Sequence, residues 1–341
     1  MNRATTLSAL VLAAVAIFGA CGGDGGPQNG DSTPQGDAAL RIVTTVAPIT
    51  SLAENIAGDA AIVTGIVPEG TNSHTFEPAP SDAKSLSAAD VIFMNGLRLE
   101  EPTRKLAEAN KRGDTEIVSL GDLTITEDDW KFDFSFPEDE GDPNPHLWPD
   151  VPLAAKYAEI MHEKIVALDP ANKATYDANY AELDRRLDAL DAGLKIAAAT
   201  VPAENRKLLT YHDSWAYWAD TYGFTVVGAA QPSDFTEPSS KEIADLIEQV
   251  TVEKVPAVFG SEVFPSDTLE TIADESGAKY IDELRDDDLP GEPGDANHSY
   301  IGLTLANMEI MLPALGGNAD ALADIDPGLV FEGESRTTYP Q

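Results

Sequence analysis

Short runs of β-branched residues alternate with amphipathic segments along most of this chain, and this alternation constrains the fold more than any other feature. Strands are expected at 40–46, 61–67, 90–95 and 116–120 and, after a gap, at 207–211, 224–228, 257–261 and 278–281. Helices are expected at 50–57, 81–88, 100–111, 151–168, 239–250, 267–276 and 299–315. Such alternation predicts parallel sheets covered by helices on both faces. Two sets of four strands predict two α/β lobes.

One long amphipathic segment separates the two sets of strands. Its apolar side chains recur at spacings of four and three residues, as one face of a helix requires: Tyr176, Tyr180, Leu183, Leu187, Leu190 and Leu194. Pro170 lies near its start and Pro202 prevents its continuation, so a helix of about 28 residues and roughly 40 Å is expected. The stripe could pair two chains as a coiled coil. A single stretch this short favours packing along its own lobes, and we expect a monomer.

The N-terminus has the pattern of an export signal. Arg3 precedes an apolar run at 7–18 that is too short to span a bilayer as a mature helix. The run ends in Phe18-Gly-Ala-Cys21, which resembles a bacterial lipobox with Phe18 at a position where an aliphatic residue is usual. We therefore expect a signal peptide at 1–20 and lipidation of Cys21. Cys21 is the only cysteine, so a disulfide within the chain is excluded.

The remaining boundaries follow from composition. Residues 21–39 are rich in Gly, Pro and Asp and should form a flexible tether. We expect an N-terminal lobe at 40–168, the linking helix at 169–200, a C-terminal lobe at 201–330 and a tail at 331–341. This organisation places the lobes outside the cytoplasm, anchored by lipid to the outer face of a single membrane or within a periplasm.

The net charge of −37 excludes one class of partner. Binding to a nucleic acid backbone requires clustered Lys and Arg, and this chain has 59 acidic residues against 22 basic ones. The acidic residues do not by themselves indicate cation binding, because a strongly solvated surface would have the same composition.

Three of the five histidines lie in polar, turn-rich segments: His74, His146 and His212. In open α/β sheets, ligands bind beyond the carboxyl ends of the strands. His74 and His212 follow expected strands, His146 ends a long polar loop, and acidic residues at 282–288 follow the last strand. Three imidazoles and a carboxylate suit a divalent transition metal such as zinc. We therefore predict a metal site between the lobes, and leave His162 and His298 out of it.

No catalytic motif accompanies these histidines. The mature chain has no His-Glu-x-x-His helix, Gly-x-Ser-x-Gly elbow or phosphate-binding glycine loop. Four protein ligands would resemble a closed site, whereas a catalytic zinc keeps a position for water. Glu262 could act as a base, but it could equally orient a metal ligand through a hydrogen bond or have a purely structural role. We expect a binding protein and not an enzyme.

Several motifs together resemble the solute-binding lipoproteins (cluster A-I) that supply zinc or manganese to ABC transporters. The resemblance covers about 40–316 and rests on the motifs Ser-His-Thr-Phe-Glu-Pro-Ala-Pro-Ser at 73–81, Pro-His-Leu-Trp at 145–148, His-Asp-Ser-Trp-Ala-Tyr-Trp-Ala-Asp-Thr-Tyr-Gly-Phe at 212–224, Glu-Pro-Ser at 237–239, and Ser299-Tyr300 with Asn307. The family implies two Rossmann-like lobes joined by one long helix, with the metal buried between them. It also implies a permease partner in the membrane.

The resemblance implies four metal ligands in this sequence: His74, His146, His212 and an aspartate. The Glu-Leu-x-x-Asp spacing points to Asp287, with Asp286 and Asp288 as alternatives. His212 stands where manganese-binding relatives tend to have Glu, and imidazole shifts preference toward zinc. Zn²⁺ is therefore the expected cargo, Mn²⁺ or Fe²⁺ the alternative, and an extracytoplasmic zinc hydrolase a weaker one. Cell adhesion is compatible with the anchor but has no specific support.

Two further expectations concern the approach of the metal. Zinc-binding relatives often carry a histidine-rich stretch before the second ligand, but here residues 127–142 carry carboxylates and aromatic residues. This loop either gathers cations weakly or is simply solvated. Binding should release protons and weaken below about pH 6, where histidine becomes charged.

Overall fold

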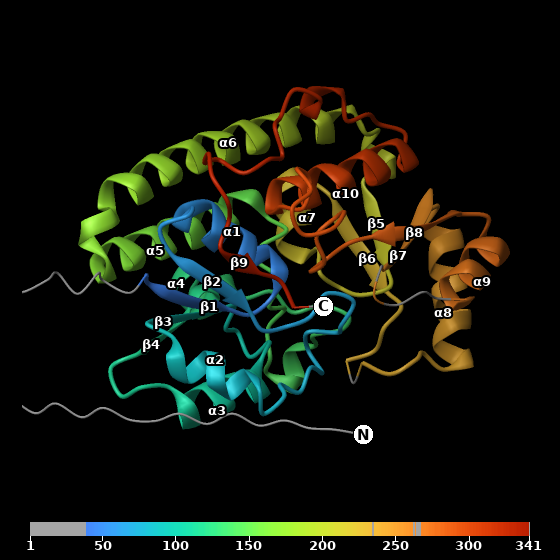
Figure 1. Ribbon diagram of the computed structural model, residues 1–341. Helices are drawn as coiled ribbons and strands as arrows, with labels where there is room; N and C mark the ends of the chain where they lie inside the picture. The colour runs from blue at the N-terminus through green and yellow to red at the C-terminus, as the bar shows by residue number, and fades with distance from the viewer. Residues whose placement is uncertain (1–38, 234, 262, 264–266, 341) are drawn as a thin grey trace, which may run out of the picture. The chain divides into compact units, whose positions relative to one another are not determined.

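The computed structural model describes residues 39–233, 235–261, 263 and 267–340 (Figure 1). The expected signal peptide, the tether with Cys21, and Glu262 lie outside these residues. Within the described part of the chain, no helix is both long and apolar enough to cross a membrane.

The first sheet is built from the N-terminal strands. It contains β1 (Arg41–Thr44), β2 (Ile62–Gly65), β3 (Val91–Met94) and β4 (Glu116–Ser119), all parallel, in the order β4-β3-β1-β2-β9. Each strand begins and ends within two residues of its expected position. The connecting and flanking helices are α1 (Ala47–Ala57), α2 (Asp82–Ala88), α3 (Glu101–Asn110) and α4 (Leu120–Thr124).

The fifth strand of this sheet was not expected from the sequence. It is β9 (Thr337–Thr338), which pairs in parallel with β2 through Val63 and Thr64. The segment at 331–341, expected as a tail, therefore returns to the N-terminal sheet. Two residues are too few to show a period, which is why the pattern along the chain did not reveal this strand.

The second sheet contains the other four expected strands. They are β5 (Lys207–Thr210), β6 (Thr225–Ala229), β7 (Ala257–Ser261) and β8 (Lys279–Leu284), also parallel, in the order β6-β5-β7-β8. The accompanying helices are α7 (Ala216–Tyr222), α8 (Ser240–Glu253), α9 (Asp267–Ser276) and α10 (Tyr300–Ala314). The predicted α/β fold with two parallel-sheet lobes is confirmed.

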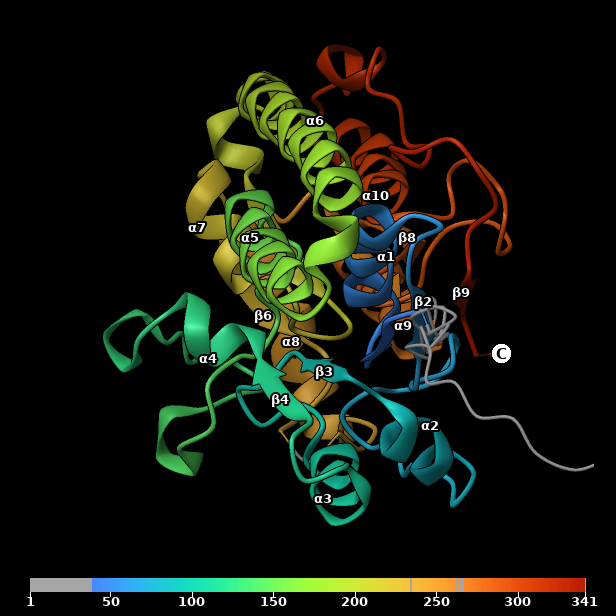
Figure 2. The same cartoon turned by 60° about the vertical axis from the view of Figure 1, so that its left-hand side comes forward.

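The expected long helix is α6 (Lys173–Thr200), which has 28 residues and runs beside α5 (Val151–Leu168) toward the second sheet (Figures 1 and 2). The predicted stripe faces the protein interior: Leu183, Leu187, Leu190 and Leu194 are at most 1% exposed. One contiguous core of buried side chains extends from α1 and the first sheet through α5 and α6 to α7 and α10. The helix thus packs on its own lobes, as predicted. Short 3₁₀ helices are η1 (Glu127–Asp129), η2 (Glu138–Glu140), η3 (Pro170–Asn172), η4 (Ala203–Asn205) and η5 (Asp320–Leu322).

Candidate metal centre

Three loops bring the predicted histidines together. His74 lies in the turn-rich segment after β2, where its backbone N–H donates to the Oδ1 of Asn72 at 2.9 Å. His146 lies just before α5, and His212 follows β5. His146 and His212 are 1% and 4% exposed. Loops from both lobes therefore deliver the three side chains to one buried place, as the positions of the strands predicted.

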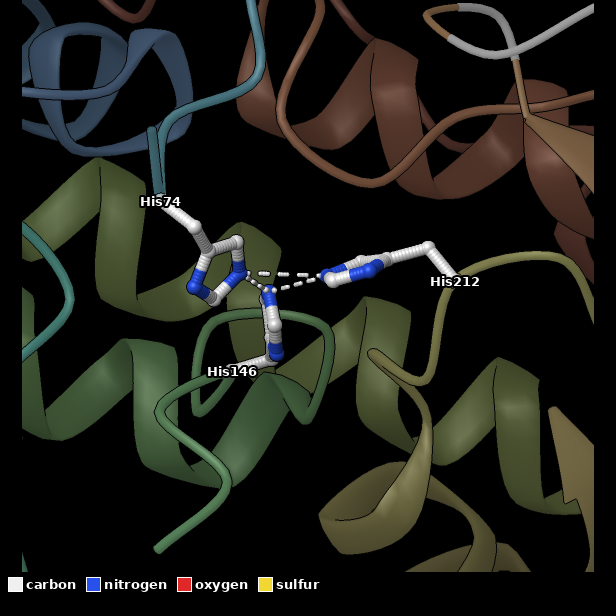
Figure 3. A group of neighbouring side chains, drawn as sticks. All are labelled: His74, His146 and His212. Carbon is white, nitrogen blue, oxygen red and sulfur yellow. Dashed lines mark hydrogen bonds between the residues drawn. The ribbon is translucent and has the colours of Figure 1, made fainter. Parts of the chain in front are cut away.

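The imidazoles meet through one nitrogen each (Figure 3). The three Nε2 atoms form a triangle in which every Nε2–Nε2 distance is 3.1 Å. Among the described residues, this is the group of histidine, cysteine and acidic side chains close enough to share an ion. An ion about 2.1 Å from each Nε2, the usual zinc–imidazole distance, would lie about 1.1 Å from the plane of the triangle.

Two amide side chains fix the orientation of the imidazoles. The Oδ1 of Asn144 lies 2.8 Å from the Nδ1 of His146, and the Oε1 of Gln231 lies 2.6 Å from the Nδ1 of His212. An amide oxygen can only accept, so Nδ1 must carry the proton in both rings. Each Nε2 then presents a lone pair to the centre of the triangle. Because two lone pairs 3.1 Å apart repel each other unless a cation lies between them, the arrangement favours a cation.

Asn144 is itself held in one orientation. Its Nδ2 donates to the Oδ2 of Asp133 at 3.0 Å and to the backbone oxygen of Asp213 at 2.7 Å. Burial raises the pKa of both carboxyl groups, and the charge of Asp133 contributes to the increase at Asp213. With both Nδ2 protons donated elsewhere, Oδ1 must be the atom that faces His146.

The environment keeps the imidazoles neutral. Burial holds the pKa values of His74 and His146 well below the usual 6.5, and the charge of His212 lowers both further. Burial lowers the pKa of His212 to about 4, against the opposing effect of the hydrogen bond that His212 donates to Gln231. The expectation of weakened binding below about pH 6 used an unperturbed histidine. The lowered pKa values move the onset of proton competition to a more acidic pH.

Two phenylalanines cover the imidazole of His74. Phe235 stacks on it at a centroid distance of 4.6 Å, and Phe136 lies 5.5 Å away. Both rings, with Glu140 and Asp142 from the acidic loop, line a cavity of about 120 Å³, and the half-buried His74 also lines it. The loop at 127–142 therefore reaches the mouth of the site. Its exposed carboxylates stand beside an apolar cover that lowers the local dielectric constant.

The aspartate-rich loop after β8 approaches from the second lobe. The Oδ2 of Asp286 lies 3.8 Å from the Nε2 of His212. The backbone oxygen of Asp286 accepts a hydrogen bond from the Nε1 of Trp148 at 2.7 Å. Asn307 of α10 binds both backbone groups of Arg285, accepting from its N–H at 2.9 Å and donating to its oxygen at 2.7 Å. The backbone leading to Asp286 is thus fixed.

The other two aspartates lie differently. Asp287 lines a small cavity with Val46 and Glu69, and neither Asp286 nor Asp287 belongs to the three-histidine group of the described residues. Asp288 accepts a hydrogen bond from the backbone N–H of Gly70 at 2.7 Å, and burial raises its pKa to about 6. The prediction of Asp287 as the fourth ligand stays a prediction, and the contact made by Asp286 makes that alternative the stronger one.

The two histidines left out of the site lie apart from the triangle group. The Nε2 of His162 contacts the Oδ1 of Asp177 at 2.9 Å, and its ring stacks on Tyr180. His298 is 4% exposed and packs against Tyr339. Sequence reasoning missed Asn144 and Gln231. Asn144 could have been found, since it lies two residues before His146, whereas Gln231 comes from the loop after β6 and carries no local signal.

Comparison with known proteins identifies the family. Residues 42–314 match the family model "ZnuA: Zinc-uptake complex component A periplasmic". The manganese-binding lipoprotein MntA of Halalkalibacterium halodurans is 30% identical over 83% of this chain and 91% of its own length. The iron-binding protein YfeA of Yersinia pestis is 30% identical over 81% of this chain and 86% of its own length.

A solved structure shows the same fold. The periplasmic zinc-binding protein TroA from Treponema pallidum superposes with a TM-score of 0.73 at 27% identity, covering 82% of this chain and 99% of that protein. The resemblance seen in the sequence motifs is confirmed. This chain belongs to the ZnuA family, the solute-binding proteins of metal ABC transporters.

Proposed function

We propose that this protein captures one divalent transition metal ion between its two lobes and delivers it to the permease of an ABC importer. One observation carries the proposal: three Nε2 atoms lie 3.1 Å from one another, and two of the three rings are oriented by amide oxygens so that they offer lone pairs. The relatives named as manganese-, iron- and zinc-binding support the class of cargo. The protein binds and releases the ion without turnover.

Zinc is the proposed cargo. Imidazole suits zinc better than it suits magnesium or calcium, and three imidazoles exceed what a hard cation prefers. Manganese or iron(II) remains the alternative, because two relatives carry those names on a similar sequence. His212→Glu separates the two. It should lower zinc affinity markedly if zinc is the cargo and change the preference little if manganese is.

Asp286 is the proposed fourth ligand, ahead of Asp287. A rotation of its carboxylate, now 3.8 Å from the Nε2 of His212, would bring an oxygen onto the open side of the triangle. The hydrogen bonds that the backbone of Arg285 and Asp286 makes with Asn307 and Trp148 fix the backbone there, so a small movement of one side chain would suffice. A carboxylate there would neutralise half of the charge of the ion.

Lipid anchoring at Cys21 would keep the lobes close to the permease. The lipobox-like Phe18-Gly-Ala-Cys21 and the Gly- and Pro-rich segment at 21–39 support this part of the proposal, as do relatives named as lipoproteins. Radiolabelled palmitate should enter the full-length chain and should not enter Cys21→Ala. Equal labelling of both chains would refute lipidation at Cys21.

Competition between metals tests the function itself. The purified mature chain, stripped of metal and offered equimolar zinc and manganese, should appear in native mass spectrometry with one zinc per chain. His146→Ala should lose the zinc. His162→Ala is the matched control, because His162 lies on α5 outside the triangle, and it should keep the zinc. Absence of stoichiometric metal from the unaltered chain would refute the proposal.

A further inference from the structure

The loop that carries His74 touches the aspartate-rich loop at a second place. Glu69 and Gly70 follow β2 and lead to His74, whereas Asp288 and Leu289 follow β8 in the other lobe. The two pairs of residues are separated by more than 200 positions in the sequence. Contacts between them therefore connect the lobes directly, beside the metal centre and distinct from it.

The contacts are reciprocal. The backbone N–H of Gly70 donates to the Oδ2 of Asp288 at 2.7 Å. The backbone N–H of Leu289 donates to the Oε1 of Glu69 at 2.9 Å. Each loop thus supplies one carboxylate acceptor and one backbone N–H donor. The two bonds together fix the separation and the register of the loops. Hydrogen bonds to a charged group are stronger than neutral ones, especially away from water.

Burial makes these bonds consequential. Asp288 and Leu289 are 8% and 3% exposed, whereas Glu69 is half-buried and Gly70 is exposed, so both bonds are partly shielded from water. Gly70 has a φ of +74°, a left-handed conformation that a glycine adopts without strain, and no atom lies within 4 Å of the place where a Cβ would stand. The glycine therefore serves the turn that aims its N–H at Asp288, and not a close contact.

The second oxygen of Glu69 faces the interior of the protein. Its Oε2 lies 3.9 Å from the Nε2 of His298, whose side chain is 1% exposed. Asp287 lines the same small cavity as Glu69 and Asp288. Glu69 is therefore surrounded by groups of both lobes, so a carboxylate at this position is held in place by the closed arrangement of the loops.

We propose that Glu69 and Asp288 form an inter-lobe latch that holds the His74 loop against the aspartate-rich loop and so slows release of the bound ion. The inference rests on the proposed function. An ion held by residues of both lobes leaves only when one ligand loop moves away, and the latch must open for that movement. Glu69 and Asp288 are positioning residues: the latch sets the lifetime of the complex, while the histidines set the capacity to bind.

Metal dissociation from the full mature chain tests the latch. The zinc-loaded protein is mixed with excess chelator in a stopped-flow instrument, and the release rate is measured for the unaltered chain, Glu69→Ala and Glu69→Gln. Loss of one partly buried charge-assisted bond should speed release by about 10-fold or more in Glu69→Ala. Glu69→Gln keeps an oxygen for the N–H of Leu289 and should release zinc much closer to the unaltered rate.

Two controls separate the latch from other causes. Glu77→Ala removes an exposed carboxylate farther along the same loop and should leave the release rate unchanged. Hydrogen exchange of the Leu289 amide should accelerate in Glu69→Ala and not in Glu77→Ala. Asp288→Asn is the companion variant for the second bond and should expose the Gly70 amide to exchange; because Asp288 is also an alternative metal ligand, the release rates of the Glu69 variants decide the test.

The outcomes are distinguishable from failure of the proposed function. If the unaltered chain holds no metal, the proposed function is refuted, and the latch, which acts on metal release, is refuted with it. If it holds one zinc and Glu69→Ala releases that zinc at the unaltered rate, the latch alone fails. Equal acceleration in Glu69→Ala and Glu69→Gln would also overturn the latch, because the effect would then belong to the charge and not to the hydrogen bond.

Discussion

The histidine side and the aspartate side of the metal centre differ in how their ligands are held. Two of the three imidazoles are fixed by dedicated amide partners, and all three Nε2 atoms already converge at 3.1 Å. On the aspartate side the backbone is fixed at Arg285 and Asp286, but the nearest described approach of the Asp286 carboxylate to the triangle is 3.8 Å, to His212. The histidine side is already organised, whereas the proposed ligand Asp286 would need a small movement to complete the site.

This difference has a functional meaning. A preformed triangle of neutral imidazoles selects a transition metal at first contact, since alkaline-earth ions gain little from nitrogen ligands. In this proposal, a carboxylate that joins afterwards adds a further ligand from the lobe of His212 and couples the ion to the latch. In this account selection belongs to the histidines and retention belongs to the aspartate-rich loop.

The largest effect should come from removing a histidine. His74→Ala, His146→Ala and His212→Ala should each lower zinc affinity by well over 100-fold, beyond the 10- to 100-fold typical for loss of a supporting partner. Isothermal titration with a chelator competitor measures the loss. If one of these variants retains the affinity of the unaltered chain, that histidine is not a metal ligand, and the contrast between the histidine side and the aspartate side fails.

The next effect distinguishes the two candidate aspartates. Asp286→Ala should weaken zinc binding by about 10- to 100-fold and mainly through faster dissociation, because the carboxylate joins a site that already holds the ion. Asp287→Ala should have the smaller effect on the same measurements. The reverse order would restore Asp287 as the fourth ligand and place the carboxylate movement elsewhere in the loop.

A smaller loss should follow from releasing one imidazole. Gln231→Ala leaves His212 free to rotate and to change tautomer, so zinc affinity should fall by about 10-fold. Gln249→Ala, in which the altered glutamine lies on α8 and donates to the backbone oxygen of Val227, serves as the matched control. Unchanged affinity in Gln231→Ala would mean that the triangle does not depend on its amide partners.

The smallest expected effect is the shift of the pH profile. Because the folded apo-protein disfavours protonated His74, His146 and His212, metal binding should persist below pH 6.5 and weaken as pH falls toward the pKa of His212 at about 4. The unfolded chain binds these protons more readily, so these groups make the apo-protein lose stability as pH falls below about 6.5. Titration of zinc affinity and apo-protein unfolding from pH 8 to 4 measures both. A midpoint of binding at or above pH 6.5 would contradict buried imidazoles.

Most of the fold could be predicted because its signals are local. Alternation of β-branched runs located eight strands, and the stripe from Tyr176 to Leu194 located α6, since periodicity reports which face is buried. The same reasoning placed His74, His146 and His212 beyond the carboxyl ends of strands or before α5. It could not find β9, whose two residues carry no period, or α4, whose five residues are too few for a full stripe, and it also missed α7.

The parts of the site that escaped prediction depend on contacts across the fold. Gln231 reaches His212 from a loop 19 residues away, and nothing in its neighbours marks it as a histidine partner. Choosing among Asp286, Asp287 and Asp288 requires the side-chain directions of three consecutive residues, which spacing along the chain does not provide. The contact of Glu69 with Leu289 spans 220 positions and has no counterpart in any local pattern.

A crystal structure of the zinc-loaded mature chain, with anomalous diffraction recorded at the zinc edge, tests the central claim most directly. The account predicts one strong anomalous peak about 2.1 Å from the Nε2 atoms of His74, His146 and His212, with a carboxylate oxygen of Asp286 completing the coordination. A peak bound by other residues, or zinc-loaded crystals in which the three imidazoles hold no ion, would contradict it.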